Sequence, residues 1–113
     1  MKDTVSILGQ KYKLLKGNEN QYPVLKDVNG YVDLYAKKII IDETFATPEG
    51  NFKSECPDLA LNHLYRHEII HAFFSETGIN YNLSDDEEES LVDWIALQFP
   101  KMKSVFEELA IEN

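Results

Sequence analysis

The chain has only one cysteine, Cys56, among its 113 residues. A protein with a single cysteine cannot form an internal disulfide, so the sequence indicates a reducing compartment. Cys56 directly precedes Pro57 at an expected helix start. We interpret it as a small residue at that position rather than as a zinc ligand or a nucleophile.

Long apolar runs and an excess of positive charge are also missing. No stretch approaches the length of a membrane-spanning helix, and the first residues contain no apolar segment of signal-peptide length. Lysine and arginine number 11 against 20 acidic residues, which gives a formal net charge of −9. Phosphates and anionic lipids attract clustered positive charge, so we expect no nucleic-acid partner and no membrane partner. We expect a soluble, cytoplasmic protein whose acidity suits a basic or unfolded protein partner.

What remains is the composition of one folded domain. With 43% apolar residues, the chain can bury a single modest core, so we predict one domain over residues 1–113. Strand signals come early and helix signals come late, which predicts an α+β fold. No repeat or low-complexity tract is present beyond a short acidic run at residues 85–89.

The first half of the chain carries the strand signals. Alternating apolar and polar residues predict a hairpin of residues 5–8 and 11–15 around a turn at Gly9 and Gln10. Residues 31–42 predict two more strands that reverse near residues 35–38, the second containing the β-branched run at 39–41. The connecting segments are rich in turn residues and are expected to be loops. We therefore predict a small antiparallel sheet.

The second half carries the helix signals. An apolar segment from Asp58 to the stop signal at Gly78 predicts a helix that is buried or nearly so. Ser84 with Glu87 three residues later is a capping-box pattern, which predicts the start of a second helix. Pro100 is expected to break that helix and to leave residues 102–109 as a separate closing helix.

The first helix contains the pattern H-E-x-x-H. His67 and His71 are four residues apart, so a helix presents both imidazoles on one face to a single metal ion. Glu68 lies about 100° further round the helix, where a general base for a zinc-activated water belongs. The pattern predicts a zinc-dependent hydrolase, most naturally a peptidase. The alternative is two core histidines bonded to backbone, with Glu68 in a salt bridge to Arg66 or Lys53.

A catalytic zinc ion normally has three protein ligands, and the second helix offers the third. Glu89 lies one turn before Asp93, on a face that continues through Val92 and Ala96. We predict Glu89 as the ligand and Asp93 as a second-shell carboxylate that holds a ligand histidine by its free N–H. Glu88 is the rival ligand, but its helical neighbours are apolar, so this face argument favours Glu89.

Three other features receive structural interpretations. The acidic residues 85–88 are expected at a solvated helix start, where the helix dipole favours negative charge. His63 is interpreted as a surface or packing residue. Trp94 is expected in the core.

The motifs together resemble a known family. H-E-I-I-H followed by E-S-L-V-D is similar to the gluzincin arrangement of two histidines on one helix and a glutamate within E-x-x-x-D on the next. Residues 89–100, E-S-L-V-D-W-I-A-L-Q-F-P, resemble a segment of ImmA/IrrE-type metallopeptidases, and more closely their small phage-encoded relatives. The likeness covers residues 30–102. The chain departs from the larger proteins at Leu91 and Asp93, where those often have Glu and Asn.

The resemblance implies a compact zincin-like, minimal gluzincin domain with one zinc ion. It implies His67, His71 and Glu89 as metal ligands and Glu68 as the catalytic base. The implied activity is hydrolysis of peptide bonds in a protein or peptide substrate. A phage or prophage origin and a role in the bacterial host cytoplasm are also implied.

The sequence also suggests where a peptide substrate would bind, and it leaves two alternative functions open. Zincins usually bind an extended peptide along an edge strand, which the resemblance would assign to residues 37–42. The competing interpretation is an edge that Lys37 and Lys38 merely protect. One alternative function is a catalytically inactive phage regulatory or inhibitory protein that retains the zinc site. The other is a metal-free interaction module. The sequence specifies neither the substrate nor the oligomeric state.

Overall fold

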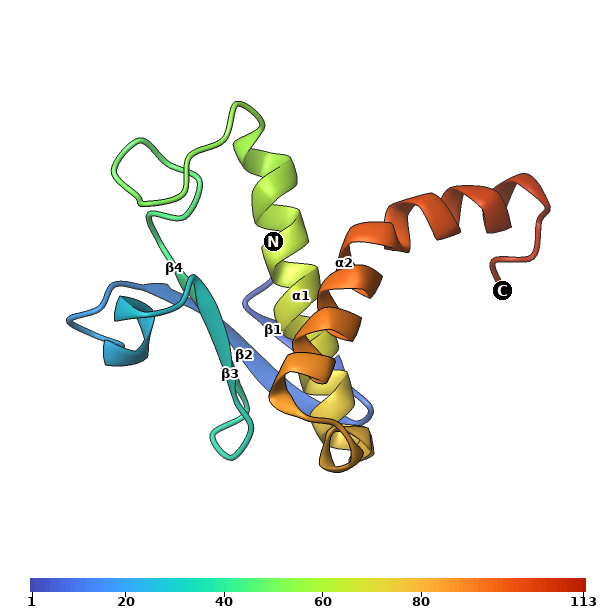
Figure 1. Cartoon of the computed structure of the whole chain (residues 1–113), viewed down its shortest axis with the longest axis horizontal. Coiled ribbons are helices and arrows are strands. Elements are labelled where there is room, and N and C mark those ends of the chain that lie inside the picture. The colour runs from blue at the N-terminus through green and yellow to red at the C-terminus, as the bar shows by residue number, and fades with distance from the viewer.

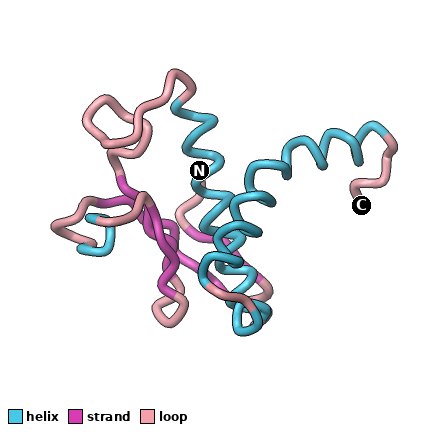
Figure 2. Tube along the Cα trace, viewed as in Figure 1, coloured by secondary structure: helices cyan, strands magenta, loops and turns pink.

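The computed structural model describes residues 1–113. Four strands come first and two long helices follow, with a short 3₁₀ helix in each half of the chain (Figures 1 and 2). The elements are β1 (Thr4–Ile7), β2 (Gln10–Gly17), η1 (Pro23–Lys26), β3 (Gly30–Asp33), β4 (Lys38–Asp42), α1 (Pro57–Thr77), η2 (Ile79–Asn82) and α2 (Asp85–Glu108). The predicted α+β class is confirmed.

The sheet is mixed, so the prediction of an antiparallel sheet was wrong. Its strand order is β1-β2-β4-β3, with β2 and β4 parallel and the other two pairs antiparallel. In β4, Ile39, Ile40 and Ile41 are at most 2% exposed. A continuous apolar run of this kind is buried on both faces, which requires a central strand. The chain therefore passes from β2 to the far edge as β3 and returns as β4 between them.

The β1–β2 hairpin is confirmed, with its turn one residue earlier than expected. Leu8 and Gly9 both have positive φ, at 49° and 84°. Two successive residues of positive φ form the turn type that matches the twist of hairpin strands.

Helix α1 crosses one face of the sheet and forms the core with it. It ends where Gly78 adopts a left-handed conformation and donates its N–H to the carbonyls of Phe74 and Ser75. The main core cluster consists of Ile7, Tyr12, Ile39, Ile41, Tyr65 and Ala72. Only three residues of α1 are buried, so the expectation of a nearly buried helix was wrong. Much of α1 outside its contacts with the sheet and α2 stays accessible.

Helix α2 begins at the predicted capping box, in which Ser84 and Glu87 exchange hydrogen bonds. It then continues through Pro100 to Glu108, so the predicted break and separate closing helix were wrong. Figure 1 shows α2 bending along its length, with its C-terminal part projecting from the body. Proline is a common cause of such a bend, because it cannot bond to the carbonyl four residues earlier. Neither long helix combines the length and apolar character needed to cross a membrane.

Candidate metal centre

The packing of α2 on α1 brings the predicted site residues together. Val92 and Ala96 on α2 are completely buried, which turns their face of α2 toward α1. Glu89 and Asp93 share that face and lie against the histidines of α1. Glu89, Val92, Asp93 and Ala96 therefore form the face of α2 that meets α1.

The Nε2 atoms of the two motif histidines point to one place. His67 Nε2 and His71 Nε2 are 3.2 Å apart. The two carboxylate oxygens of Glu89 lie 3.2 Å from His67 Nε2 and 2.7 Å from His71 Nε2. Three potential ligand groups from two helices thus converge, and the Glu89 side chain is 60% exposed on the solvent side of the group.

The opposite ring nitrogen of each histidine has its own carboxylate. Glu88 Oε2 lies 2.5 Å from His71 Nδ1, and Asp93 Oδ1 lies 3.3 Å from His67 Nδ1. A carboxylate that accepts the Nδ1–H of an imidazole leaves the Nε2 lone pair free for a metal. Asp93 is where the sequence predicted it. The contact of Glu88 was missed, because only its apolar neighbours within α2 were considered and its partner lies on α1.

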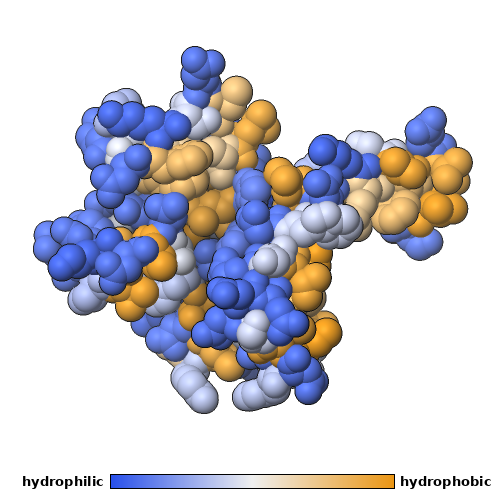
Figure 3. Space-filling model, in the orientation of Figure 1, coloured by the Kyte–Doolittle hydropathy of each residue, from blue (hydrophilic) through white to orange (hydrophobic).

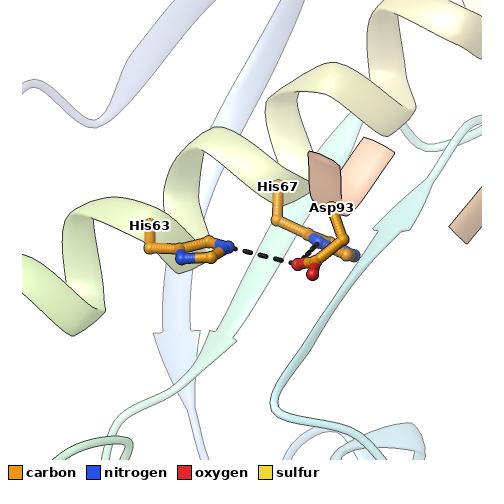
Figure 4. Close-up of side chains that lie close together, drawn as sticks. All are labelled: His63, His67 and Asp93. Carbon is orange, nitrogen blue, oxygen red and sulfur yellow. Dashed lines mark hydrogen bonds and ion pairs between the residues drawn. The ribbon is translucent and has the colours of Figure 1, made fainter. Parts of the chain in front are cut away.

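His63 also enters the site. Its Nε2 atom lies 3.1 Å from Asp93 Oδ1, the same oxygen that contacts His67. Figure 4 shows the Asp93 carboxylate between the two imidazole rings. His63 therefore does more than pack on the helix surface, since it shares the carboxylate that holds His67. Its position one turn before His67 was the signal in the sequence.

Glu68 lies beneath this group and is 5% exposed. No ion pair joins it to Arg66 or Lys53, so the alternative salt bridge does not form. Burial raises the pKa of Glu68 to about 7; interaction with His71 lowers that pKa and interaction with Glu89 raises it. A buried carboxyl in such surroundings is stabilised as the charged form by a nearby cation.

The arrangement fits a metal ion. His67, Glu68 and His71 each place one potential ligand atom within 4.8 Å of the others, and so do His63, His67 and Asp93. Ligands about 2.1 Å from a tetrahedral zinc ion lie about 3.4 Å from one another. The 3.2 Å spacings of His67 Nε2 to His71 Nε2 and to Glu89 are close to that value, whereas His71 Nε2 and Glu89 Oε1 are 2.7 Å apart, which is a hydrogen-bond distance. In the group of His63, His67 and Asp93, one oxygen of the Asp93 carboxylate contacts both imidazole rings, which is the geometry of a shared hydrogen bond.

A cavity of about 790 Å³ opens beside the two helices. It is lined by Val28, Asn29, Gly30, Tyr31, Val32, Phe45, Phe52, Ala60, His63, Leu64, His67, Glu68, His71, Ser75, Glu88, Glu89 and Asp93. The lining contains carboxylates but no lysine or arginine. It is therefore an acidic cavity with an apolar part, and the candidate metal-binding cluster forms one of its walls.

The edge strand at this cavity is β3, so the assignment of the edge to residues 37–42 was wrong. β4 is paired on both sides, and Lys37 instead binds Glu76 on α1. The register of β3 on β4, with Asp42 N–H donating to Asn29, turns the backbone groups of Tyr31 and Asp33 toward β4. The backbone groups of Gly30 and Val32 consequently point to the open edge.

Gly30 allows β3 to lie close to Glu68. A side-chain carbon at Gly30 would stand 2.9 Å from Ile41 Cδ1 and 3.3 Å from Glu68 Cγ. The first distance is shorter than side-chain carbons accept, so only glycine fits without a shift of its neighbours. The open edge and Glu68 are thereby held next to each other.

Comparisons of the chain with protein-family models, curated proteins and solved structures give no significant match.

Proposed function

We propose that the protein is a zinc metallopeptidase that hydrolyses peptide bonds of a protein substrate. One observation carries the proposal: two imidazole Nε2 atoms and the Glu89 carboxylate converge within 3.2 Å beside a buried glutamate, in an open cavity. Structural zinc sites are normally closed by four protein ligands, whereas catalytic sites use three and leave one position open.

His67, His71 and Glu89 would hold the ion. Their nitrogen and oxygen donors suit zinc. Asp93 and Glu88 contact the Nδ1 atoms of the two histidines, which would leave the Nε2 atoms free to bind the metal. When bound, zinc supplies Lewis acidity, which lowers the pKa of water to about 7 and polarises a carbonyl. The similarity of these motifs to gluzincins supports the same ligand set.

Glu68 would serve as the base. It directly follows His67 in sequence and lies in one cluster with His67 and His71 in space. It would accept a proton from the water whose oxygen bonds to the peptide carbon, and deliver that proton to the amine as the carbon–nitrogen bond breaks. The substrate could lie along β3, where the free backbone groups of Gly30 and Val32 accept another extended strand.

The partner class follows from the same features. An open sheet edge and an acidic cavity suit a neutral or basic peptide, and the net charge of −9 disfavours nucleic acid. The resemblance to small phage-encoded proteins adds a bacterial cytoplasm as the proposed place of action.

The test compares zinc-loaded wild type with Glu68→Gln and Glu89→Ala on a defined mixture of unstructured synthetic peptides, with mass spectrometry of the products. We expect internal cleavage by wild type and at least a hundredfold slower cleavage by Glu68→Gln, which should still bind zinc. Glu89→Ala should lose zinc and activity together.

Two results would contradict the proposal. Undiminished cleavage by Glu68→Gln would remove that residue from the role of base. Stoichiometric zinc without cleavage of any peptide in wild type would favour the alternative of a zinc-stabilised regulatory or inhibitory binding protein.

A further inference from the structure

The cavity beside the metal centre is apolar at the end nearest the start of α1. Ala60 and Leu64 line it from α1, and Phe45 and Phe52 line it from the loop that connects β4 to α1. The two phenylalanine rings are stacked, with centroids 4.9 Å apart and planes 4° from parallel. Figure 3 shows hydrophobic residues gathered over this loop and the adjoining end of α1. The opposite end, at Ser75 and Glu88, is polar.

Local structure holds the phenylalanine pair in place. Ala46 pairs with Lys53 in an isolated bridge, and the Ala46 N–H donates to the Phe52 carbonyl at 3.0 Å. A side-chain carbon on Gly50 would lie 2.2 Å from the Thr44 carbonyl oxygen, so the loop can close only with glycine there. The loop thereby folds Phe52 back onto Phe45, although Phe52 remains 46% exposed.

We propose that Phe45 and Phe52 form a side-chain subsite that receives an aromatic or large aliphatic residue of an extended peptide. The inference names the substrate preference of the proposed peptidase and rests on that function for the cleavage step. Binding of a peptide to this subsite does not require that the protein cleaves it. A half-exposed stacked aromatic pair that faces a cavity gains stability when a further apolar side chain covers it.

The position of this subsite along the peptide follows from the helix. Ala60 precedes His67 by two turns, which is about 10 Å along α1. β3 runs beside α1 (Figure 1), so a peptide added to β3 would follow the same direction. An extended chain advances about 3.3 Å per residue, so the apolar residue would lie about three residues from the hydrolysed bond.

The charge of the cavity lining limits which residues the rest of the peptide can carry. Glu88, Glu89 and Asp93 line the other part of the cavity beside the three histidines that contact them, and no lysine or arginine lines it. Acidic residues near the hydrolysed bond would be repelled, whereas neutral or basic residues would not. The occupant is therefore a neutral or basic extended peptide with one large apolar anchor.

The experiment measures binding and cleavage separately. Two capped decapeptides of alanine, serine and one lysine differ only in a single Phe or Ala at one position. Calorimetry gives their affinities for zinc-loaded Glu68→Gln, alone and combined with Phe52→Ala, Phe52→Leu or Phe106→Ala. Phe106 is a matched control, because it is 42% exposed but lies on α2 and does not line the cavity.

We expect the Phe peptide to bind at least about tenfold more tightly than the Ala peptide. Phe52→Ala should abolish that preference, Phe52→Leu should retain part of it, and Phe106→Ala should leave it intact. Equal binding of the two peptides to Glu68→Gln would overturn the subsite, even if wild type cleaves both. Selective binding without cleavage by wild type would support the subsite and contradict the peptidase. Cleavage of the Phe peptide directly beside Phe would overturn the three-residue spacing.

Discussion

Glu88 Oε2 lies 2.5 Å from Nδ1 of His71, on the side of the ring opposite to the Nε2 atom that faces Glu89. The two adjacent glutamates of α2 therefore contact the two different nitrogens of one imidazole. This geometry gives them different roles. Glu89 is suited to bind the ion, and Glu88 is suited to orient His71 and fix the ring proton on Nδ1.

Zinc affinities should separate these roles. Glu88→Ala should weaken zinc binding about 10- to 100-fold, because His71 loses the carboxylate that orients it. Glu88→Gln should recover part of the loss, since an amide oxygen can still accept the Nδ1–H. Glu89→Ala should lose more affinity than either, because a ligand is removed. Competition against a fluorescent zinc chelator measures all three.

The control for this series is Asp86→Ala, which removes an exposed acidic residue from the same helix start. Its zinc affinity should match wild type. A greater loss in Glu88→Ala than in Glu89→Ala would reverse the assignment and make Glu88 the ligand.

Gly30 offers a test of the contact between the edge strand and the base. Gly30→Ala would place a carbon 2.9 Å from Ile41, which is completely buried, and 3.3 Å from Glu68. Relief requires a shift of Ile41, β3 or Glu68 and should cost about 1–3 kcal/mol of stability. We expect zinc binding to persist and kcat/KM to fall at least tenfold, because the proposed base, Glu68, and the proposed peptide-binding edge of β3 move apart.

A second glycine distinguishes a local effect from general destabilisation. Gly78 has a φ of 78°, and a carbon added there meets nothing closer than 3.7 Å. Gly78→Ala should therefore lower the free energy of unfolding through backbone strain alone, by about 1–2 kcal/mol. Its kcat/KM at a temperature where it is folded should equal that of wild type. Equal losses of kcat/KM in both variants would refute a specific role for Gly30.

Local signals in the sequence suffice to predict several features of the structure. The capping box at Ser84, the stop at Gly78 and the spacing of His67 and His71 each depend on a few neighbouring residues. The structure contains the capping box, the helix end at Gly78 and the two neighbouring imidazoles. The shared face of Glu89 and Asp93 follows from helical periodicity and also places both residues against α1.

The features that were missed depend on partners distant in sequence. The parallel pairing of β4 with β2 is decided by the whole sheet, although the continuous run of isoleucines could have indicated a central strand. The stacking of Phe45 on Phe52 depends on closure of their loop. Trp94, expected in the core, is 56% exposed because α2 contacts α1 through its Val92 and Ala96 face.

The ion pair between Lys37 and Glu76 predicts a pH-dependent contribution to stability. Lys37 Nζ lies 2.6 Å from Glu76 Oε1, and the buried Tyr12 hydroxyl donates to the same oxygen. The hydrogen bond from Lys37, followed by that from Tyr12, lowers the pKa of Glu76 below its usual 4.5. The folded state thus favours the carboxylate, and its contribution is present above pH 4.5 and lost as pH falls through the lowered pKa.

Melting temperatures across pH test this sign. Glu76→Gln should melt below wild type at pH 7, and the difference should shrink as the pH is lowered below about 4. Glu107→Gln is the control, because the Lys103–Glu107 pair is exposed and 3.6 Å long. Such pairs contribute little, so that variant should follow wild type at every pH. A Glu76→Gln difference that grows toward acid pH would contradict the assignment.

Pro100 and Arg66 are linked through one carbonyl group. Pro100 has no N–H, so it cannot donate to the carbonyl of Ala96 four residues earlier. The guanidinium of Arg66 donates its Nε–H to that same oxygen at 2.8 Å. A side chain of α1 therefore satisfies the acceptor that the proline leaves free, which explains why α2 continues through Pro100 as a helix.

A double-mutant cycle tests this link. Arg66→Met keeps the apolar stem and removes the donor, which should cost about 1.5–3 kcal/mol, the usual value of a charged hydrogen bond. In a Pro100→Ala background the new N–H can bond to Ala96, so the same substitution should cost about 1 kcal/mol less. Urea denaturation of the four proteins gives the coupling. An identical cost in both backgrounds would show that Arg66 stabilises the helix pair independently of Pro100.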